Sequence, residues 1–181
     1  MKATRREILA GMAVTTAVAG QAAAETPAAR TPPRLEWVFS AKVTLAPPFE
    51  RGTVDGQRKR FIAITGGDVT GPKLTGVVLP GGGDWQSIHA DGLTELDARY
   101  SLQANDGTVI AVTNPGMRVA SPAVIKRIAA GEDVDPALYY FRTTPRFEVA
   151  DGPHGWLRRS IFIARGIRKP DHVLIEFFLV G

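Results

Sequence analysis

Residues 93–113, LTELDARYSLQANDGTVIAVT, decide the fold class of this chain. From Leu96 to Leu102 every second residue is apolar, and the residues between them are polar or charged. Such alternation is typical of a β-strand with two different faces. The pair Asp106-Gly107 then separates this run from the next one, and Asp-Gly between two alternating runs favours a tight turn with positive φ. The stretch therefore predicts an antiparallel β-hairpin.

Alternating runs of the same kind recur on both sides of this hairpin and are separated by Gly, Pro, Asp and Asn. They read LEWVFSAKVTL, RFIAITGG, KLTGVVLPGG, LYYFRTTPRFEV, WLRRSIFIARGI and HVLIEFFLV. About eight or more strands at this spacing predict an all-β fold, a sandwich or a single antiparallel β-barrel. One segment differs, because Ser121 can cap, Pro122 suits a first helical position and Gly131 can end a helix. A short helix is expected near residues 121–130.

The first 24 residues are predicted to be an export signal rather than part of the fold. Arg5 and Arg6 stand side by side before a short apolar run, and small residues up to Ala24 suit signal peptidase. The adjacent arginines resemble the twin-arginine pattern, which implies the twin-arginine export machinery as a partner and a periplasmic or secreted protein. The apolar run is too short for a membrane anchor, so no stable membrane insertion is expected after cleavage. Residues 25–34 then read as a disordered tether, and residues 35–181 as the barrel domain.

Composition and motifs exclude several functional classes. The 181 residues contain no cysteine, so thiol catalysis and disulfides are ruled out. The net charge is +4, partly because of the signal, and it gives no reason to expect nucleic-acid binding. His89, His154 and His172 are scattered, so no metal site is expected. The glycine-rich stretch at 64–85 lacks the Gly-Lys-Ser/Thr sequence of a phosphate-binding loop, and we expect no cofactor. Its glycines are expected to allow bends and close strand approach at a barrel corner.

Two pairs of residues are candidates for chemistry. Asp97 and Arg99 lie on the same face of their predicted strand, as do Tyr140 and Arg142 in YYFRTTPRF. In one interpretation both columns simply face water. In the other, Asp97 and Arg99 line the lumen of a barrel, where Asp97 serves as a catalytic acid or base and Arg99 stabilises an oxyanion. The alternation alone leaves both interpretations open.

The chain resembles a bacterial and fungal family known as domain of unknown function 3237. The resemblance spans most of the chain after the signal and is most specific in GGDVTGPKLTGVVLPGGGDW, ELDARYSLQANDGTVI and YYFRTTPRFEV. It implies a small barrel like those of lipocalins and streptavidin. It also implies a ligand site that includes Asp84, Trp85, Tyr140 and Arg142 beside the Asp97 and Arg99 pair. Arg158 departs from the family pattern, because an asparagine usually follows the Trp-Leu pair there.

Three functions remain open on this basis. The first is an exported barrel that binds a small, partly apolar molecule in its lumen, with Asp84, Trp85, Tyr140, Arg142 and Trp156 as ligand-binding residues. The second is a cofactor-free isomerase, dehydratase or cyclase that acts on a carbonyl compound in the same pocket. The third is a structural envelope or interaction module with a side-chain-filled interior. The fold cannot choose among them, and the sequence leaves the ligand and the oligomeric state open.

Overall fold

The structure, a computed structural model, describes residues 30–181 and consists of one antiparallel sheet with short helical segments. The strands are β1 (Leu35–Leu45), β2 (Phe49–Val54), β3 (Gln57–Thr70), β4 (Gly76–Ile88), β5 (Leu93–Ala104), β6 (Val109–Ala120), β7 (Tyr139–Thr143), β8 (Arg146–Val149), β9 (Phe162–Arg168) and β10 (His172–Val180). The helical segments are α1 (Pro122–Ala129), η1 (Pro136–Leu138) and η2 (Gly155–Arg159).

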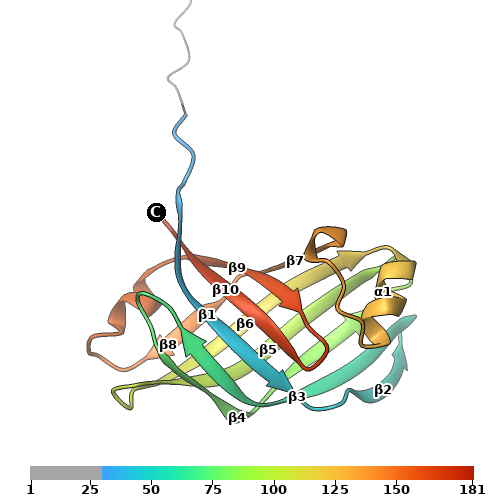
Figure 1. Ribbon diagram of the computed structural model, residues 1–181, viewed down its shortest axis with the longest axis horizontal. Coiled ribbons are helices and arrows are strands. Elements are labelled where there is room, and N and C mark those ends of the chain that lie inside the picture. The colour runs from blue at the N-terminus through green and yellow to red at the C-terminus, as the bar shows by residue number, and fades with distance from the viewer. Residues whose placement is uncertain (1–29) are drawn as a thin grey trace, which may run out of the picture. The chain divides into compact units, whose positions relative to one another are not determined.

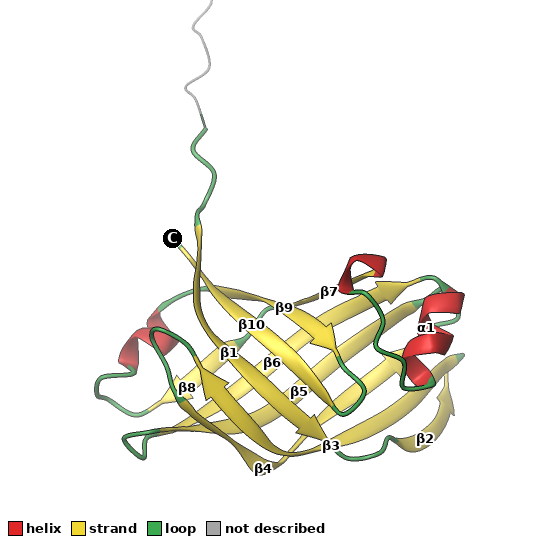
Figure 2. Cartoon of the chain, in the orientation of Figure 1, coloured by secondary structure: helices red, strands yellow, loops and turns green. Residues whose placement is uncertain are grey.

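The sheet closes on itself because β1 pairs with β10 on one side and with β3 on the other. The closed order is β1-β10-β9-β7-β6-β5-β4-β3, which makes an eight-stranded antiparallel barrel (Figure 1). Two further strands are attached to it, since β2 forms a hairpin with β3 and β8 pairs with β6. Figure 2 shows how completely strands dominate the wall. The prediction of a single antiparallel barrel is confirmed.

The predicted hairpin is formed by β5 and β6, whose register runs from Leu93 opposite Val119 to Gln103 opposite Val109. At its turn the Thr108 amide donates to Asp106 Oδ1 at 2.9 Å, and Gly107 has φ +87°. The short aspartate side chain thus supplies an acceptor within the turn, and glycine supplies the left-handed conformation.

The predicted helix is α1, and it lies beside the end of the barrel that carries the β2–β3 hairpin (Figure 1). Ser121 Oγ accepts a hydrogen bond from the Val124 amide at 3.3 Å, which satisfies one of the free donors of the first turn. Gly131 follows the helix with φ +81°, and its amide donates to the Ile128 carbonyl at 3.1 Å. The side chain of Ile128 is buried in the barrel core, so the helix is anchored through one apolar face.

A bulge interrupts β4 at its glycines. The register against β5 shifts between Leu79 and Gly83, and Gly81 within the shift has φ +106°. A Cβ on Gly83 would lie 2.1 Å from the ring of Phe61, so a larger residue would displace that ring. The expectation of a bend with close strand approach is confirmed. After the bulge the strand resumes its alternation and places Asp84 and Gln86 on the inner face.

Aromatic rings fill one half of the interior, where β1 begins and β10 ends. Phe39 stacks on Phe177 with ring centroids 4.5 Å apart, and Phe147 meets Phe162 edge-on at 5.0 Å. Phe39 and Phe177 are fully buried, and Trp156 on η2 covers the cluster from outside through Phe162 at 5.7 Å. These rings occupy that half, and the cavity described below lies in the other half.

The predicted export signal and the first part of the predicted tether lie outside the described residues. Residues 30–34 form neither helix nor strand, and Arg34 is tied to the last residue of the chain by two backbone hydrogen bonds of 2.8 and 2.9 Å with Gly181. The barrel ladder begins at Leu35. Within the described part, no helix is long and apolar enough to cross a membrane.

Substitution of the central ring of the aromatic cluster tests this account of the core. We expect Phe177→Ala to lower the free energy of unfolding by about 3–5 kcal/mol, because it removes buried contacts and leaves a cavity. Phe49→Ala is the matched control, since Phe49 is 66% exposed and should change stability by less than about 0.5 kcal/mol. Urea denaturation followed by circular dichroism measures both, and equal effects would contradict the assignment.

Candidate functional site

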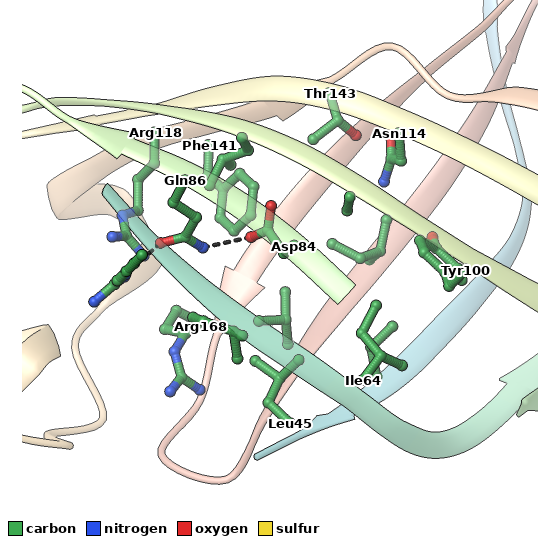
Figure 3. Close-up of a pocket in the computed structure, with 17 residues that line it drawn as sticks. Leu45, Ile64, Asp84, Gln86, Tyr100, Asn114, Arg118, Phe141, Thr143 and Arg168 are labelled. Carbon is green, nitrogen blue, oxygen red and sulfur yellow. Dashed lines mark hydrogen bonds between the residues drawn. The ribbon is translucent and has the colours of Figure 1, made fainter. Parts of the chain in front are cut away.

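The half of the barrel away from the aromatic cluster encloses a cavity lined by 17 residues (Figure 3). The enclosed part of the cavity has a volume of about 60 Å³, and together with the surrounding space that is open to solvent the volume is about 610 Å³. That inner space suits a small organic molecule rather than a long lipid chain. Much of the wall is apolar and is formed by Val43, Ile62, Ile64, Leu96, Phe141 and Ile175.

The period of two along each strand determines which side chains reach the cavity. On β5 the inward residues are Leu96, Ala98 and Tyr100, and on β6 Asn114 and Arg118 take part in the lining. Nearer the other end of β6, Ile110 and Val112 occupy the same inward face within the apolar core. The inner face of β6 therefore changes along its length from apolar to polar, and the cavity lies at the polar end.

A chain of hydrogen bonds joins three polar side chains near one end of the cavity. Arg60 Nε, on β3, donates to Gln86 Oε1 at 2.6 Å, and Gln86 Nε2 donates to Asp84 Oδ2, both residues lying on β4. Gln86 is buried, with 6% of its surface exposed. Because an amide has both a donor and an acceptor, Gln86 relays between the guanidinium and the carboxyl group and holds both in place.

Two further arginines line the same cavity. Arg118 is only 5% exposed, and its Nε has no hydrogen-bond partner within the protein. Arg168, at the end of β9, donates from Nη1 to the carbonyl of Lys169 and, at 2.9 Å, to that of His172. These bonds fix the Arg168 guanidinium to the β9–β10 turn without neutralising its charge.

Burial changes the acid–base properties of these groups. Loss of water raises the pKa of Asp84 above its usual value, while the Gln86 hydrogen bond and the charges of Arg60 and Arg118 oppose that rise. Burial, with the nearby charges of Arg60 and Arg168, lowers the pKa of Arg118 to about 10. The site thus combines a carboxyl group that holds its proton more strongly than usual with a guanidinium that remains charged at neutral pH.

A second polar group lies deeper in the lumen and consists of Tyr100, Asn114 and Thr143. They come from three neighbouring strands, β5, β6 and β7, and their side chains are all buried. Figure 3 shows them on one side of Asp84, with Arg118 and Gln86 on the other. Burial also raises the pKa of Tyr100, so the phenol stays neutral and can donate a hydrogen bond.

Most of the unpaired buried polar atoms in the described part of the chain line this cavity. Seven such side-chain atoms lack a hydrogen-bond partner, and five belong to cavity residues: Asp84 Oδ1, Tyr100 Oη, Asn114 Oδ1, Arg118 Nε and Thr143 Oγ1. Each such group costs about 1–3 kcal/mol if it stays unpaired in a folded protein. Their concentration in one cavity is typical of a site built to bind a polar ligand.

The structure places Asp97 and Arg99 on the outer face of β5. Arg99 Nη2 lies 3.0 Å from Asp97 Oδ2, and the two side chains are 63% and 43% exposed, respectively. The interpretation that they line the lumen as a catalytic pair is therefore wrong. Both side chains face water, as the alternative interpretation expected. Alternation defined the two columns of this strand, and the column of Leu96, Ala98 and Tyr100 is the one that faces inward.

The remaining predicted ligand residues divide in the same way. Trp85 and Tyr140 are exposed on the outer face, at 41% and 50%, and the guanidinium of Arg142 lies 5.2 Å from the Tyr140 ring. Trp156 packs over the aromatic half, away from the cavity. These four do not line the cavity, which corrects their expected position. Asp84 does line it, and its role in binding stays a prediction.

Sequence reasoning missed the polar residues that face the lumen: Arg60, Gln86, Tyr100, Asn114, Arg118, Thr143 and Arg168. A signal was available for some of them. In 109–120 the inward positions read Ile110, Val112, Asn114, Gly116 and Arg118, so a polar residue replaces an apolar one within a single column. Polar residues on the face that is otherwise apolar indicate a buried site better than charges on the opposite face do.

A metal centre has no support in the described residues, because no group of three or more histidine or acidic side chains there could hold an ion. Arg158 lies on η2, where it donates to the Val149 carbonyl at 3.2 Å and pairs with Asp151. It does not line the cavity, so its departure from the family pattern leaves the cavity wall unchanged.

The closed sheet and the polar lumen together define a small antiparallel β-barrel protein with an internal cavity. The particular family follows from the sequence, since the model for "Protein of unknown function (DUF3237)" matches residues 33–180. The chain belongs to this family. Among its relatives, a UPF0311 protein of Clostridium acetobutylicum is 39% identical over 147 residues, which cover 81% of this chain and 93% of the relative.

Solved structures agree with the fold. A conserved protein of unknown function from Rhodopseudomonas palustris superposes with a TM-score of 0.81 at 34% identity, covering 84% of this chain and all of the other. An enzyme from Penicillium herquei superposes with a TM-score of 0.64 at 25% identity, covering 86% and 100%. A hydroalkoxylation enzyme, phnH, of Penicillium herquei is 41% identical over 83 residues, which are 46% of this chain and 55% of that protein.

The pH dependence of stability tests the buried carboxyl group. Because the folded protein raises the pKa of Asp84, it holds a proton that the unfolded chain releases, so ionisation of Asp84 lowers stability as the pH rises above about 4. We expect Asp84→Asn to gain stability relative to the wild type as the pH increases through this range. Urea denaturation from pH 4 to 8 measures the difference, and Asp97→Asn on the outer face is the control. A difference that is constant with pH would contradict the shift.

Proposed function

We propose that this barrel binds a small, partly apolar molecule in its lumen. The observation that carries the proposal is the set of five unpaired buried polar atoms in a cavity whose other walls are apolar. Apolar walls favour a hydrocarbon body, and the polar atoms would fix its orientation through hydrogen bonds. A barrel whose interior is filled by side chains would have no such cavity, so the alternative of a purely structural module has less support.

The position of the site within the fold supports the same function. The aromatic half carries the stable packing, so the other half can contain polar groups without loss of the core. Unpaired polar groups reduce stability, and they are expected where a ligand supplies the missing partners. Asp84, Gln86 and Arg60 hold one another through hydrogen bonds before any ligand enters, so binding would need little rearrangement of these side chains.

We further propose that the protein acts outside the cytoplasm. The adjacent Arg5 and Arg6, the apolar run after them and the small residues before Ala24 support export through the twin-arginine route with cleavage near Ala24. This route carries folded proteins, which suits a barrel whose strands from the two ends of the chain pair directly, as β1 does with β10.

Native mass spectrometry of protein purified from the periplasm of its host tests both proposals at once. We expect a mass that begins near residue 25 and an additional peak for a retained small molecule. Ala98→Leu should weaken or abolish that peak, because Ala98 lines the cavity and the larger side chain occupies ligand space. Ala111→Leu is the matched control, since Ala111 is exposed on the outer face.

The possible outcomes test lumen binding, signal cleavage and export separately. An additional peak that survives Ala98→Leu as strongly as Ala111→Leu would contradict binding in the lumen. A mature protein that still contains residues 1–24 would contradict cleavage, and recovery from the cytoplasm alone would contradict export.

A second candidate function is supported by a specific observation, the raised pKa of buried Asp84 among arginines. A carboxyl group that holds its proton can act as an acid, and nearby guanidinium groups stabilise negative charge on an oxygen. The similarity to a hydroalkoxylation enzyme points to the same kind of proton transfer. We propose cofactor-free cyclisation as the reaction, if the ligand is also transformed.

The step balances without any oxidant or reductant. The Asp84 carboxyl group gives its proton to one carbon of a C=C bond, and a hydroxyl oxygen of the same molecule forms a bond to the other carbon. The hydroxyl proton passes to the Asp84 carboxylate, which restores the acid. The product is a cyclic ether with the same composition as the substrate.

The probe 2-allylphenol tests this candidate, with the cyclic ether detected by gas chromatography and mass spectrometry. We expect the wild type to form the ether faster than buffer does, and Asp84→Asn to lose at least about a hundredfold in rate, as is common when a general acid is removed. Asp97→Asn should keep the wild-type rate. Equal rates for Asp84→Asn and Asp97→Asn, or no ether with the wild type, would contradict the cyclase proposal and leave the binding proposal standing.

A further inference from the structure

Positive charge exceeds negative charge in the cavity wall. Arg60, Arg118 and Arg168 line it, and Asp84 is the one carboxylate among the 17 lining residues. None of the ion pairs found within residues 30–181 includes any of these four side chains. Three guanidinium groups therefore line the cavity with one carboxyl group, whose pKa burial raises, and none of the four forms an ion pair within these residues.

Arg118 is the most informative of the three. It is only 5% exposed to solvent, yet its Nε has no hydrogen-bond partner within the protein. A buried charge without a partner is strongly destabilising, whereas the same charge beside an anion is not. Arg118 is thus arranged for a negatively charged group that is not part of this chain.

The neighbouring arginines are held in place by other contacts. Arg60 is fixed by its hydrogen bond of 2.6 Å to Gln86, and Arg168 by the carbonyls of the β9–β10 turn. Both can keep their positions when the cavity is occupied. Because a guanidinium matches the two oxygens of a carboxylate, such a cluster favours a carboxylate over a neutral amide.

The other end of the polar surface has a different character. Tyr100, Asn114 and Thr143 are neutral and lie away from Arg118 along the cavity (Figure 3). Apolar side chains such as Ile64 and Phe141 line the wall as well. A molecule that satisfies the whole wall has an anionic group at one end, an apolar body and a neutral hydrogen-bonding group at the other.

We propose that the ligand class is a small amphipathic carboxylate, bound with its carboxylate group against Arg118, Arg60 and Arg168. Its apolar body lies along the wall, and a carbonyl or hydroxyl group reaches Tyr100, Asn114 and Thr143. The inference rests on the proposed binding function and adds the chemical class of the ligand. Arg118 is a specificity-determining residue in this arrangement.

Calorimetric titration with a matched pair of probes tests the proposal. The probes are 3-phenylpropanoate and its neutral analogue 3-phenylpropanamide, at pH 7.5, where Arg118 is charged because its pKa is about 10. We expect the carboxylate to bind the wild type at least tenfold more tightly than the amide. Arg118→Gln should remove that preference, because it removes the charge and keeps a hydrogen-bonding side chain.

Arg99→Gln is the matched control, since Arg99 lies on the outer face and the same substitution there should leave both affinities unchanged. Arg60→Gln provides a second test if Arg118→Gln fails to fold by circular dichroism, and we expect it to weaken the preference for the carboxylate as well. Arg118→Lys should restore part of the preference through its charge.

The outcomes distinguish this inference from the proposed function. Equal affinity of the wild type for the two probes, or an unchanged preference in Arg118→Gln, would overturn the carboxylate site while lumen binding stands. Binding of neither probe would also overturn it. If, in addition, native mass spectrometry finds no retained molecule in the periplasmic protein, the binding function itself fails.

Discussion

The pairing of β1 with both β10 and β3 is the constraint on which the rest of this structure depends. It closes the sheet, so that every strand has one face toward an enclosed interior and one toward solvent. Successive side chains along a strand are assigned to opposite sides of that wall. The same closure gives the edges of eight strands a partner without any disulfide, which suits a chain that has no cysteine.

Closure also divides the interior into two parts with different physical roles. The ring pairs around Phe39, Phe147 and Phe177 supply dense apolar packing in one half. The bulge at the β4 glycines comes just before Asp84, which lines the cavity in the other half. The dense aromatic packing lies in the half of the barrel away from the cavity. The polar cavity can then contain Asp84 and Arg118, whose burial is unfavourable, because the packed half and the backbone ladder hold the barrel together.

Much of the fold was predictable from local patterns, and the site was not. The Asp106-Gly107 turn and the Ser121 cap are signals contained within a few residues, and the structure has both features where they were expected. Asp84 was predicted to reach the ligand site and does lie in the cavity wall. Asp97 and Arg99 were the more conspicuous pair, but they form an exposed ion pair of the kind that contributes little stability.

By itself, the sequence determined the alternating columns of each strand, the turns between them and membership of a barrel family, because these depend on spacing and on residue conformation. Only the tertiary structure decided which column faces inward and which residues of distant strands meet. Arg60, Asp84, Arg118 and Arg168 come from four different strands, and nothing in their own surroundings in the sequence marks them as neighbours. Barrel closure brings them together, because register and shear across the sheet are properties of strand pairing rather than of any one segment.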